Sequence, residues 1–279
     1  MVIPMVKVDD VLKTIDSNEN FSSEFKEDMK YLLVLLTQKI PRLDLETLNS
    51  KLVDLKIKAT DNQYMTKMPT KYVESENTIY INLSESSKDY DYRYLLTREL
   101  LLLQTYKDDV TKPRYDNFTP IYEGYASICA NNLIGNEGSL NSYEDEEITV
   151  NLLGRIVGLE SLEELFYNNN QNLLLDNLNK AGVKKDQFRK LLDLMNYNLS
   201  ARNNERGKSM LSSIQRELIN MFVNKNLTKE EIENFRENLY GNNTVFGNKN
   251  KYEGVTPVIY ATFDNATINN LDTKKTKTM

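Results

Sequence analysis

The segment Leu95–Gln104, LLTRELLLLQ, constrains the fold of this chain more than any other part of the sequence. Leucines fall on nearly every side of the helix that it predicts, so this helix is expected to be buried all round. Arg98 and Glu99 interrupt the apolar pattern. Burying a charge costs several kcal/mol per ion, to order of magnitude, unless the charge is paired. The two side chains are therefore expected either to have charged partners or to serve a function.

The chain of 279 residues contains no histidine and one cysteine, Cys129. These counts exclude a Ser-His-Asp triad, a Cys-His pair, an imidazole-bound zinc ion and a zinc ion held by several thiolates. Any acid–base chemistry must come from Asp, Glu, Lys or Tyr. Cys129 lies among small and apolar residues in a predicted helix, and we interpret it as a buried, unreactive thiol.

The charge balance and the N-terminal sequence bear on partners and location. The formal net charge is −6, which argues against a nucleic-acid partner because such proteins carry a basic face. No basic start followed by an apolar core is seen, and no run approaches the roughly 20 apolar residues that span a bilayer. We therefore expect a cytoplasmic protein with no membrane partner.

Local patterns predict a series of helices and one clear strand. Apolar residues at three-and-four spacing predict helices at 22–40 and 44–55. The segment TIYINL, 78–83, alternates as a half-exposed strand does, and we place it at the edge of a sheet. The helix that carries the charged pair is predicted at 90–106. Further helices are predicted at 121–135, 142–157, 161–167, 172–180, 185–197, 208–225 and 229–239.

Together these elements predict an α+β fold that is predominantly α-helical. A small sheet with an edge strand precedes a central helix, and a helical part follows. We divide the chain into an N-terminal α/β part (1–110), a helical part that carries Glu123 (111–240) and an Asn/Thr-rich segment with a frayed basic tail (241–279).

Two short features have simple structural interpretations. The acidic run Glu144–Glu147 opens a predicted helix, and we interpret it as a solvated N-terminus that the helix dipole favours. Gly124, in the segment YEGYAS, is interpreted as a small residue at a close approach of two helices.

The segment TRELLLL resembles the T-H-E-x-x-H-L helix of zincin metallopeptidases, with Glu99 at the place of the catalytic glutamate. The strand NTIYIN precedes it, where zincins place the edge strand that holds extended substrate. YEGYAS follows, and resembles the segment in which gluzincins keep a glutamate as third zinc ligand. Glu123 follows Glu99 by 24 positions, compatible with a thermolysin-like arrangement. The resemblance covers about residues 72 to 170.

Both histidine places of the zincin motif are substituted in this sequence. Arg98 and Leu102 stand there, so the resemblance implies a degenerate member that holds no metal and no other cofactor. Leucine offers no lone pair, and a protonated guanidinium repels a cation. We expect Arg98 to pair with Glu123 and with Glu99 as a substitute for the zinc cross-link, and Leu102 to fill the remaining volume.

The function expected from this resemblance is that of a catalytically inactive zincin-like protein that binds or scaffolds a partner. An extended peptide or protein would add along NTIYIN, with Tyr80, Tyr122 and Tyr125 near the cleft. One alternative is an enzyme, a hydrolase or lyase, that uses carboxylates and tyrosines in the same cleft. Another is a helical interaction protein unrelated to zincins, which requires that the strand before the central helix does not pair in a sheet.

Overall fold

The computed structural model describes residues 6–60, 68–82, 91–134 and 143–200, with isolated positions between 210 and 230. Three helices come first: α1 (Val8–Ser17), α2 (Ser23–Lys39) and α3 (Leu45–Leu52). The side chains of Ser22 and Asp44 cap α2 and α3 by accepting backbone N–H groups of the first turn. The sequence patterns predict α2 and α3, but α1 was not predicted.

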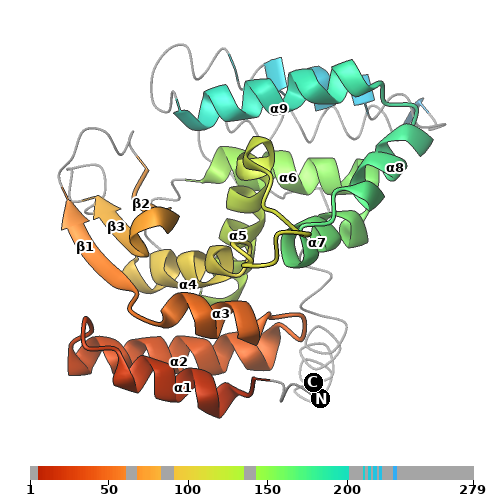
Figure 1. Ribbon diagram of the computed structural model, residues 1–279. Helices are drawn as coiled ribbons and strands as arrows, with labels where there is room; N and C mark the ends of the chain where they lie inside the picture. Colours follow the sequence, from red (N-terminus) through yellow and green to blue (C-terminus); the bar gives the residue numbers. More distant parts are fainter. Residues whose placement is uncertain are drawn as a thin grey trace, which may run out of the picture.

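A three-stranded sheet follows the first three helices (Figure 1). Its strands are β1 (Lys56–Thr60), β2 (Thr70–Val73) and β3 (Thr78–Asn82), in the order β1-β3-β2. β3 runs parallel to β1 and antiparallel to β2. A short 3-10 turn, Glu74–Glu76, and the left-handed residue Asn77 connect β2 to β3.

The prediction that the strand NTIYIN lies at the edge of the sheet is wrong. β3 lies between β1 and β2, and in the described part of the chain the two edges belong to those strands. Alternation along β3 cannot distinguish the two positions, because both a central and an edge strand can present one half-exposed face. β1 and β2 are short and weakly patterned, so no local pattern indicates the partners of β3.

Six further α-helices follow in the described ranges up to residue 200. Their bounds are α4 (Tyr92–Leu103), α5 (Thr119–Ile134), α6 (Glu144–Val157), α7 (Leu159–Asn168), α8 (Asn172–Lys180) and α9 (Lys185–Ser200). A 3-10 turn, Asp116–Phe118, leads into α5. α4 packs against α5, α5 packs against α6, and one buried apolar cluster extends from α1 to α9. The predominantly helical α+β fold is therefore confirmed.

Some predicted features fall outside the described residues. Most of the predicted helices at 208–225 and 229–239 and the whole segment 241–279 belong to this group. The predicted division near residue 110 falls in the connection between α4 and α5. Within the described ranges, no helix has both the length and the apolar character needed to cross a membrane.

The contact between α5 and α6 confirms one interpretation and overturns another. A Cβ atom on Gly124 would lie 2.5 Å from the backbone oxygen of Glu146, so glycine permits the close approach. The interpretation of Glu144–Glu147 as a solvated N-terminus is wrong for two of its residues: Glu146 is 3% exposed and Glu147 is 1% exposed. The first turn of α6 lies against α5, which buries these carboxylates.

Candidate functional site

The central helix α4 places a guanidinium at the middle of the fold. α4 begins after Asp91, whose carboxylate accepts the backbone N–H of Arg93 at 2.8 Å. All residues from Tyr94 to Leu103 are buried, as the apolar pattern predicts. Arg98 is fully buried among them, so its charge must be balanced by groups inside the protein.

The partners of Arg98 come from its own helix and from two other elements. The guanidinium forms ion pairs with Glu123 on α5 and with the adjacent Glu99. Its Nη1 also donates to Oγ1 of Thr70 on β2 at 3.0 Å. The Thr70 hydroxyl in turn donates to Oε1 of Glu99 at 2.5 Å. One cation therefore connects the central helix, the next long helix and an edge strand, and we call Thr70, Arg98, Glu99, Glu123 and Tyr143 the Arg98 cluster.

Tyr143 covers the face of the guanidinium. The guanidinium carbon of Arg98 lies 3.6 Å from the centre of the Tyr143 ring, and both side chains are fully buried. This is a cation–π contact in a desolvated place, where such contacts are strongest. Burial alone would lower the pKa of Arg98, but Tyr143 and Glu99 outweigh that effect and raise the pKa. The guanidinium therefore stays protonated.

The side chains at the positions that the resemblance assigns to zinc ligands do not fit a zinc ion. Leu102 is buried in the apolar cluster and has no donor atom, and the Arg98 side chain supplies a cation in place of a lone pair. Among the described residues, no three His, Cys, Asp or Glu side chains are placed to hold a metal ion. Arg98 and Glu123 are brought together as predicted, while Leu102 contributes packing only.

The three tyrosines predicted to lie at the cleft make their described contacts elsewhere. The Tyr80 hydroxyl donates to Glu76 at 2.5 Å. Tyr122 is buried, donates to Oδ1 of Asn169 at 3.3 Å and lies under the guanidinium of Arg114, 4.4 Å from ring centre to carbon. Burial raises the pKa of Tyr122 to about 12, so its hydroxyl holds its proton at neutral pH.

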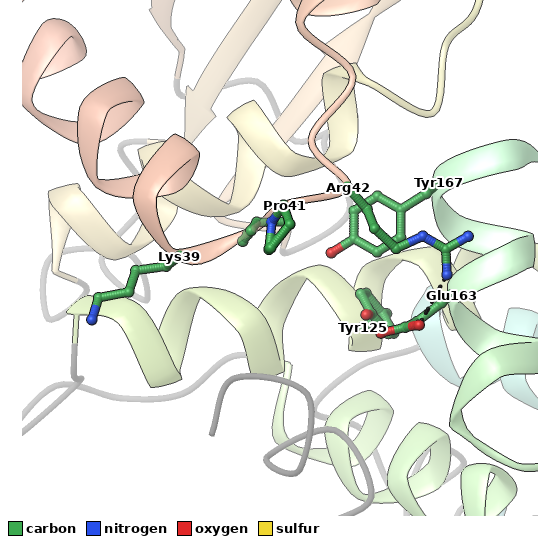
Figure 2. A pocket seen from close by; sticks show the side chains of 7 residues that line it. Lys39, Pro41, Arg42, Tyr125, Glu163 and Tyr167 are labelled. Atoms are coloured by element: carbon green, nitrogen blue, oxygen red, sulfur yellow. Dashed lines mark hydrogen bonds and ion pairs between the residues drawn. The ribbon is translucent and has the colours of Figure 1, made fainter. Parts of the chain in front are cut away.

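Tyr125 lines a small hollow where the turn after α2 meets α7. Figure 2 shows Arg42 reaching from that turn toward Glu163, with which it forms an ion pair at 2.9 Å. Tyr125 and Tyr167 form the aromatic wall, with ring centres 5.8 Å apart. Tyr125 also packs against Phe166, with ring centres 4.5 Å apart, and its described contacts do not include Arg98.

A second buried polar chain, which was not predicted, connects α4, α5 and α6. The hydroxyls of Tyr94 and Ser127 share a hydrogen bond of 2.5 Å, and Ser127 donates to Oε1 of Glu147 at 2.5 Å. The amide of Asn131 donates to the same oxygen. Two donors, Ser127 and Asn131, therefore satisfy Oε1 of the buried Glu147.

Two members of the Arg98 cluster were not predicted from the sequence. Thr70 lies in a four-residue strand whose pairing partner could not be recognised, and Tyr143 lies in SYEDEE, a segment interpreted as solvated. A guanidinium can be attracted to the face of an aromatic ring, but that principle does not select one of the 17 tyrosines.

Comparison with protein-family models, curated proteins and solved structures finds no match for this chain.

Proposed function

We propose that this protein is a catalytically inactive relative of the zincin metallopeptidases that acts by binding or scaffolding a partner. The observation that supports it best is the buried guanidinium of Arg98, paired with Glu99 and Glu123. These two carboxylates stand at the places that the resemblance gives to the catalytic base and the third zinc ligand. A permanent cation between them leaves neither carboxylate available for a metal or a proton transfer.

The burial of the cluster also argues against the alternative of a carboxylate or tyrosine enzyme. A general acid or base must come within hydrogen-bond distance of its substrate. Arg98, Glu99 and Glu123 are all buried, and Tyr122 and Tyr125 are buried too. The other alternative, a helical protein unrelated to zincins, required an unpaired strand before the central helix, whereas β3 pairs on both sides.

An extended peptide remains the proposed partner, but β3 cannot receive it. Strand addition needs an exposed edge with unpaired backbone groups. Both sides of β3 are taken by β1 and β2. A peptide that pairs with the described sheet therefore has to add at β1 or β2.

Zinc binding tests the proposal directly. The full chain is titrated with zinc in a calorimeter and its melting temperature is measured with zinc and with a chelator. We expect no stoichiometric binding and the same melting temperature in both conditions. A tightly bound zinc ion that the chelator removes with a fall in melting temperature would overturn the proposal.

A double substitution tests the ancestry. Arg98→His with Leu102→His restores both imidazoles of the motif beside Glu123, which is the donor set of a zincin site. We expect zinc to bind this variant at one equivalent and to raise its melting temperature. Arg98→Ala with Leu102→Ala is the matched control, because it removes the guanidinium without adding ligands. A folded His variant that binds zinc no better than this control would contradict descent from a zinc site.

A further inference from the structure

The outer side of β1 is one of the two edges of the described sheet. β1 is exposed or half-exposed along its whole length. Its described partner is β3 on one side, and Figure 1 shows β1 at the outer border of the sheet. Lys56 donates its backbone N–H to Asn77 at 3.0 Å, on the β3 side. The backbone N–H and C=O groups of successive residues point to opposite sides of a strand, so those of Ile57 and Ala59 point away from β3.

The side chains of β1 divide into a charged face and an apolar face. Lys56 and Lys58 are exposed on one face, with no ion pair among the described residues. Ile57, half-exposed, and Ala59, exposed, lie on the other face. The lysines are paired in register with the uncharged Thr78 and Tyr80 of β3. Two cations therefore stand at the border of a protein whose net charge is −6.

Lys71 extends the basic character of that face across the sheet. It pairs in register with Tyr80 from the β2 side, so Tyr80 lies between Lys58 and Lys71 in one row. Lys71 is exposed and also has no described ion pair. The row therefore carries an aromatic ring and two cations. Its nearest described carboxylate is Glu76, which accepts a hydrogen bond from the Tyr80 hydroxyl.

We propose that the outer edge of β1 binds an extended acidic segment of a partner protein by strand addition. Residues directly opposite each other on neighbouring strands have their Cβ atoms about 5 Å apart, so acidic side chains at alternate positions would face Lys56 and Lys58. The positions between them would lie beside Ile57 and Ala59 and should be apolar. The partner segment is therefore one in which acidic and apolar residues alternate.

This inference names the partner of the proposed binding function, and it differs from that function in its test. The zinc experiments test the Arg98 cluster, whereas only the peptide-binding experiment tests the edge of β1. A protein that binds zinc and also binds the acidic peptide would refute only the proposed inactivity. A protein that binds neither would refute only the edge of β1.

The probe is a fluorescein-labelled peptide of alternating glutamate and valine, with anisotropy measured on the full chain at low salt. A lysine–valine peptide and a peptide with the same glutamates and valines in two blocks are the comparison probes. We expect both to bind about tenfold more weakly or worse, since the first reverses the charges and the second loses the alternation. Binding of the alternating acidic peptide should also weaken as salt rises.

Three variants separate the backbone contribution from the charge contribution. Ala59→Pro removes one outward N–H of the edge and leaves the β3 ladder intact, which an edge strand tolerates. Lys56→Glu with Lys58→Glu reverses the charge of the charged face. The Pro variant and the double Glu variant should each bind the acidic peptide about tenfold more weakly than the unchanged chain. Lys184→Glu with Lys185→Glu, at exposed positions at the start of α9, is the matched control and should bind like the unchanged chain.

Several results would overturn the proposal. Equal affinity for the acidic peptide in the unchanged chain and in the lysine-reversal variant excludes β1 as the site. Equal affinity for the alternating and the block peptide excludes strand addition. Tighter binding of oligothymidine through the same lysines would assign the face to a nucleic acid. Lysines at a sheet edge also oppose pairing of that edge with another sheet. The proposal is therefore also refuted if the unchanged chain does not bind the acidic peptide and the lysine-reversal variant differs from it only in self-association, measured by sedimentation.

Discussion

Arg98 on α4 and Glu123 on α5 form a buried ion pair. In the proposed relationship to zincins, this ion pair takes the place of the metal ion that joins the two helices of an active enzyme. A guanidinium needs no exogenous ion and presents several donors in a fixed plane, so it can bind Glu99, Glu123 and Thr70 together. The connection is therefore permanent, and its strength depends on the protein sequence alone.

Removing either partner of this pair should strongly destabilise the fold. Arg98→Ala leaves Glu123 buried without its cation, and Glu123→Ala leaves part of the guanidinium charge unbalanced. We expect each change to lower the free energy of unfolding by about 3–5 kcal/mol. Urea unfolding monitored by circular dichroism measures it. The double variant should cost less than the sum of the two single changes, because the second removal takes away an unpaired charge.

Arg93→Ala is the matched control for this experiment. Arg93 is also on α4 and pairs with Asp28 at 3.3 Å, but its side chain is 55% exposed. Exposed pairs contribute about 0–1 kcal/mol. If Arg98→Ala and Arg93→Ala lowered the free energy of unfolding by the same amount, burial of the Arg98 cluster would not add to stability.

The ring of Tyr143 should contribute separately from its hydroxyl. Tyr143→Phe keeps an aromatic face 3.6 Å from the guanidinium carbon, and Tyr143→Leu replaces it with an aliphatic side chain. A desolvated cation–π contact contributes about 2 kcal/mol, so the Leu variant should be less stable than the Phe variant by that amount. The same difference should nearly vanish in an Arg98→Met background. A difference that persists there would assign the effect to packing of the ring.

The sequence predicted the parts of this site that depend on local pattern. The helix around Arg98 follows from its leucines. The pairing with Glu123 was expected from the cost of burying a charge and from the resemblance of these segments to zincin motifs. The α2, α4 and α5 bounds lie within three residues of the predicted ones, because apolar spacing and caps are local signals.

What the sequence did not predict depends on contacts between distant segments. β1 and β2 have five and four residues, too few for alternation to reveal which strand lies between the others. The composition of the acidic run before Ile148 predicts a solvated segment, whereas the packing of α6 against α5 leaves Glu146 and Glu147 buried. Thr70 reaches Glu99 because β2 packs beside α4, and no local pattern encodes that packing.

Gly124→Ala should destabilise the protein, although alanine is the better helix former. In an exposed helix interior this change would stabilise by about 0.5–1 kcal/mol. Here the new Cβ would lie 2.5 Å from the Glu146 oxygen and 2.7 Å from a methyl group of Val150, so α5 and α6 must separate. We expect a net loss of about 1–3 kcal/mol in urea unfolding. A gain in stability would mean that the two helices move apart at no cost.

Asp44 provides a test of stability against pH at the start of α3. Its carboxylate accepts the Thr47 N–H at 3.0 Å and pairs with Lys107. Burial alone would raise the pKa of Asp44, but the hydrogen bonds from Lys107 and Thr47 outweigh it and lower the pKa. A lowered pKa means that the unfolded chain binds the proton more readily. The stabilisation is therefore present above the ordinary pKa of about 4 and is lost as the pH falls through the folded value.

Asp44→Asn isolates this charge, because asparagine caps a helix about as well as aspartate. Near pH 7 the unchanged chain should be more stable than the variant by about 1 kcal/mol, since the pair with Lys107 is partly exposed. Urea unfolding at a series of pH values should show this difference shrinking below about pH 4 as Asp44 takes up its proton. Asp28→Asn, at the exposed pair with Arg93, is the control and should differ less from the unchanged chain near pH 7. A difference at Asp44 that stays constant down to pH 2 would show that the amide disturbs the cap itself, and that the pair with Lys107 adds no stability.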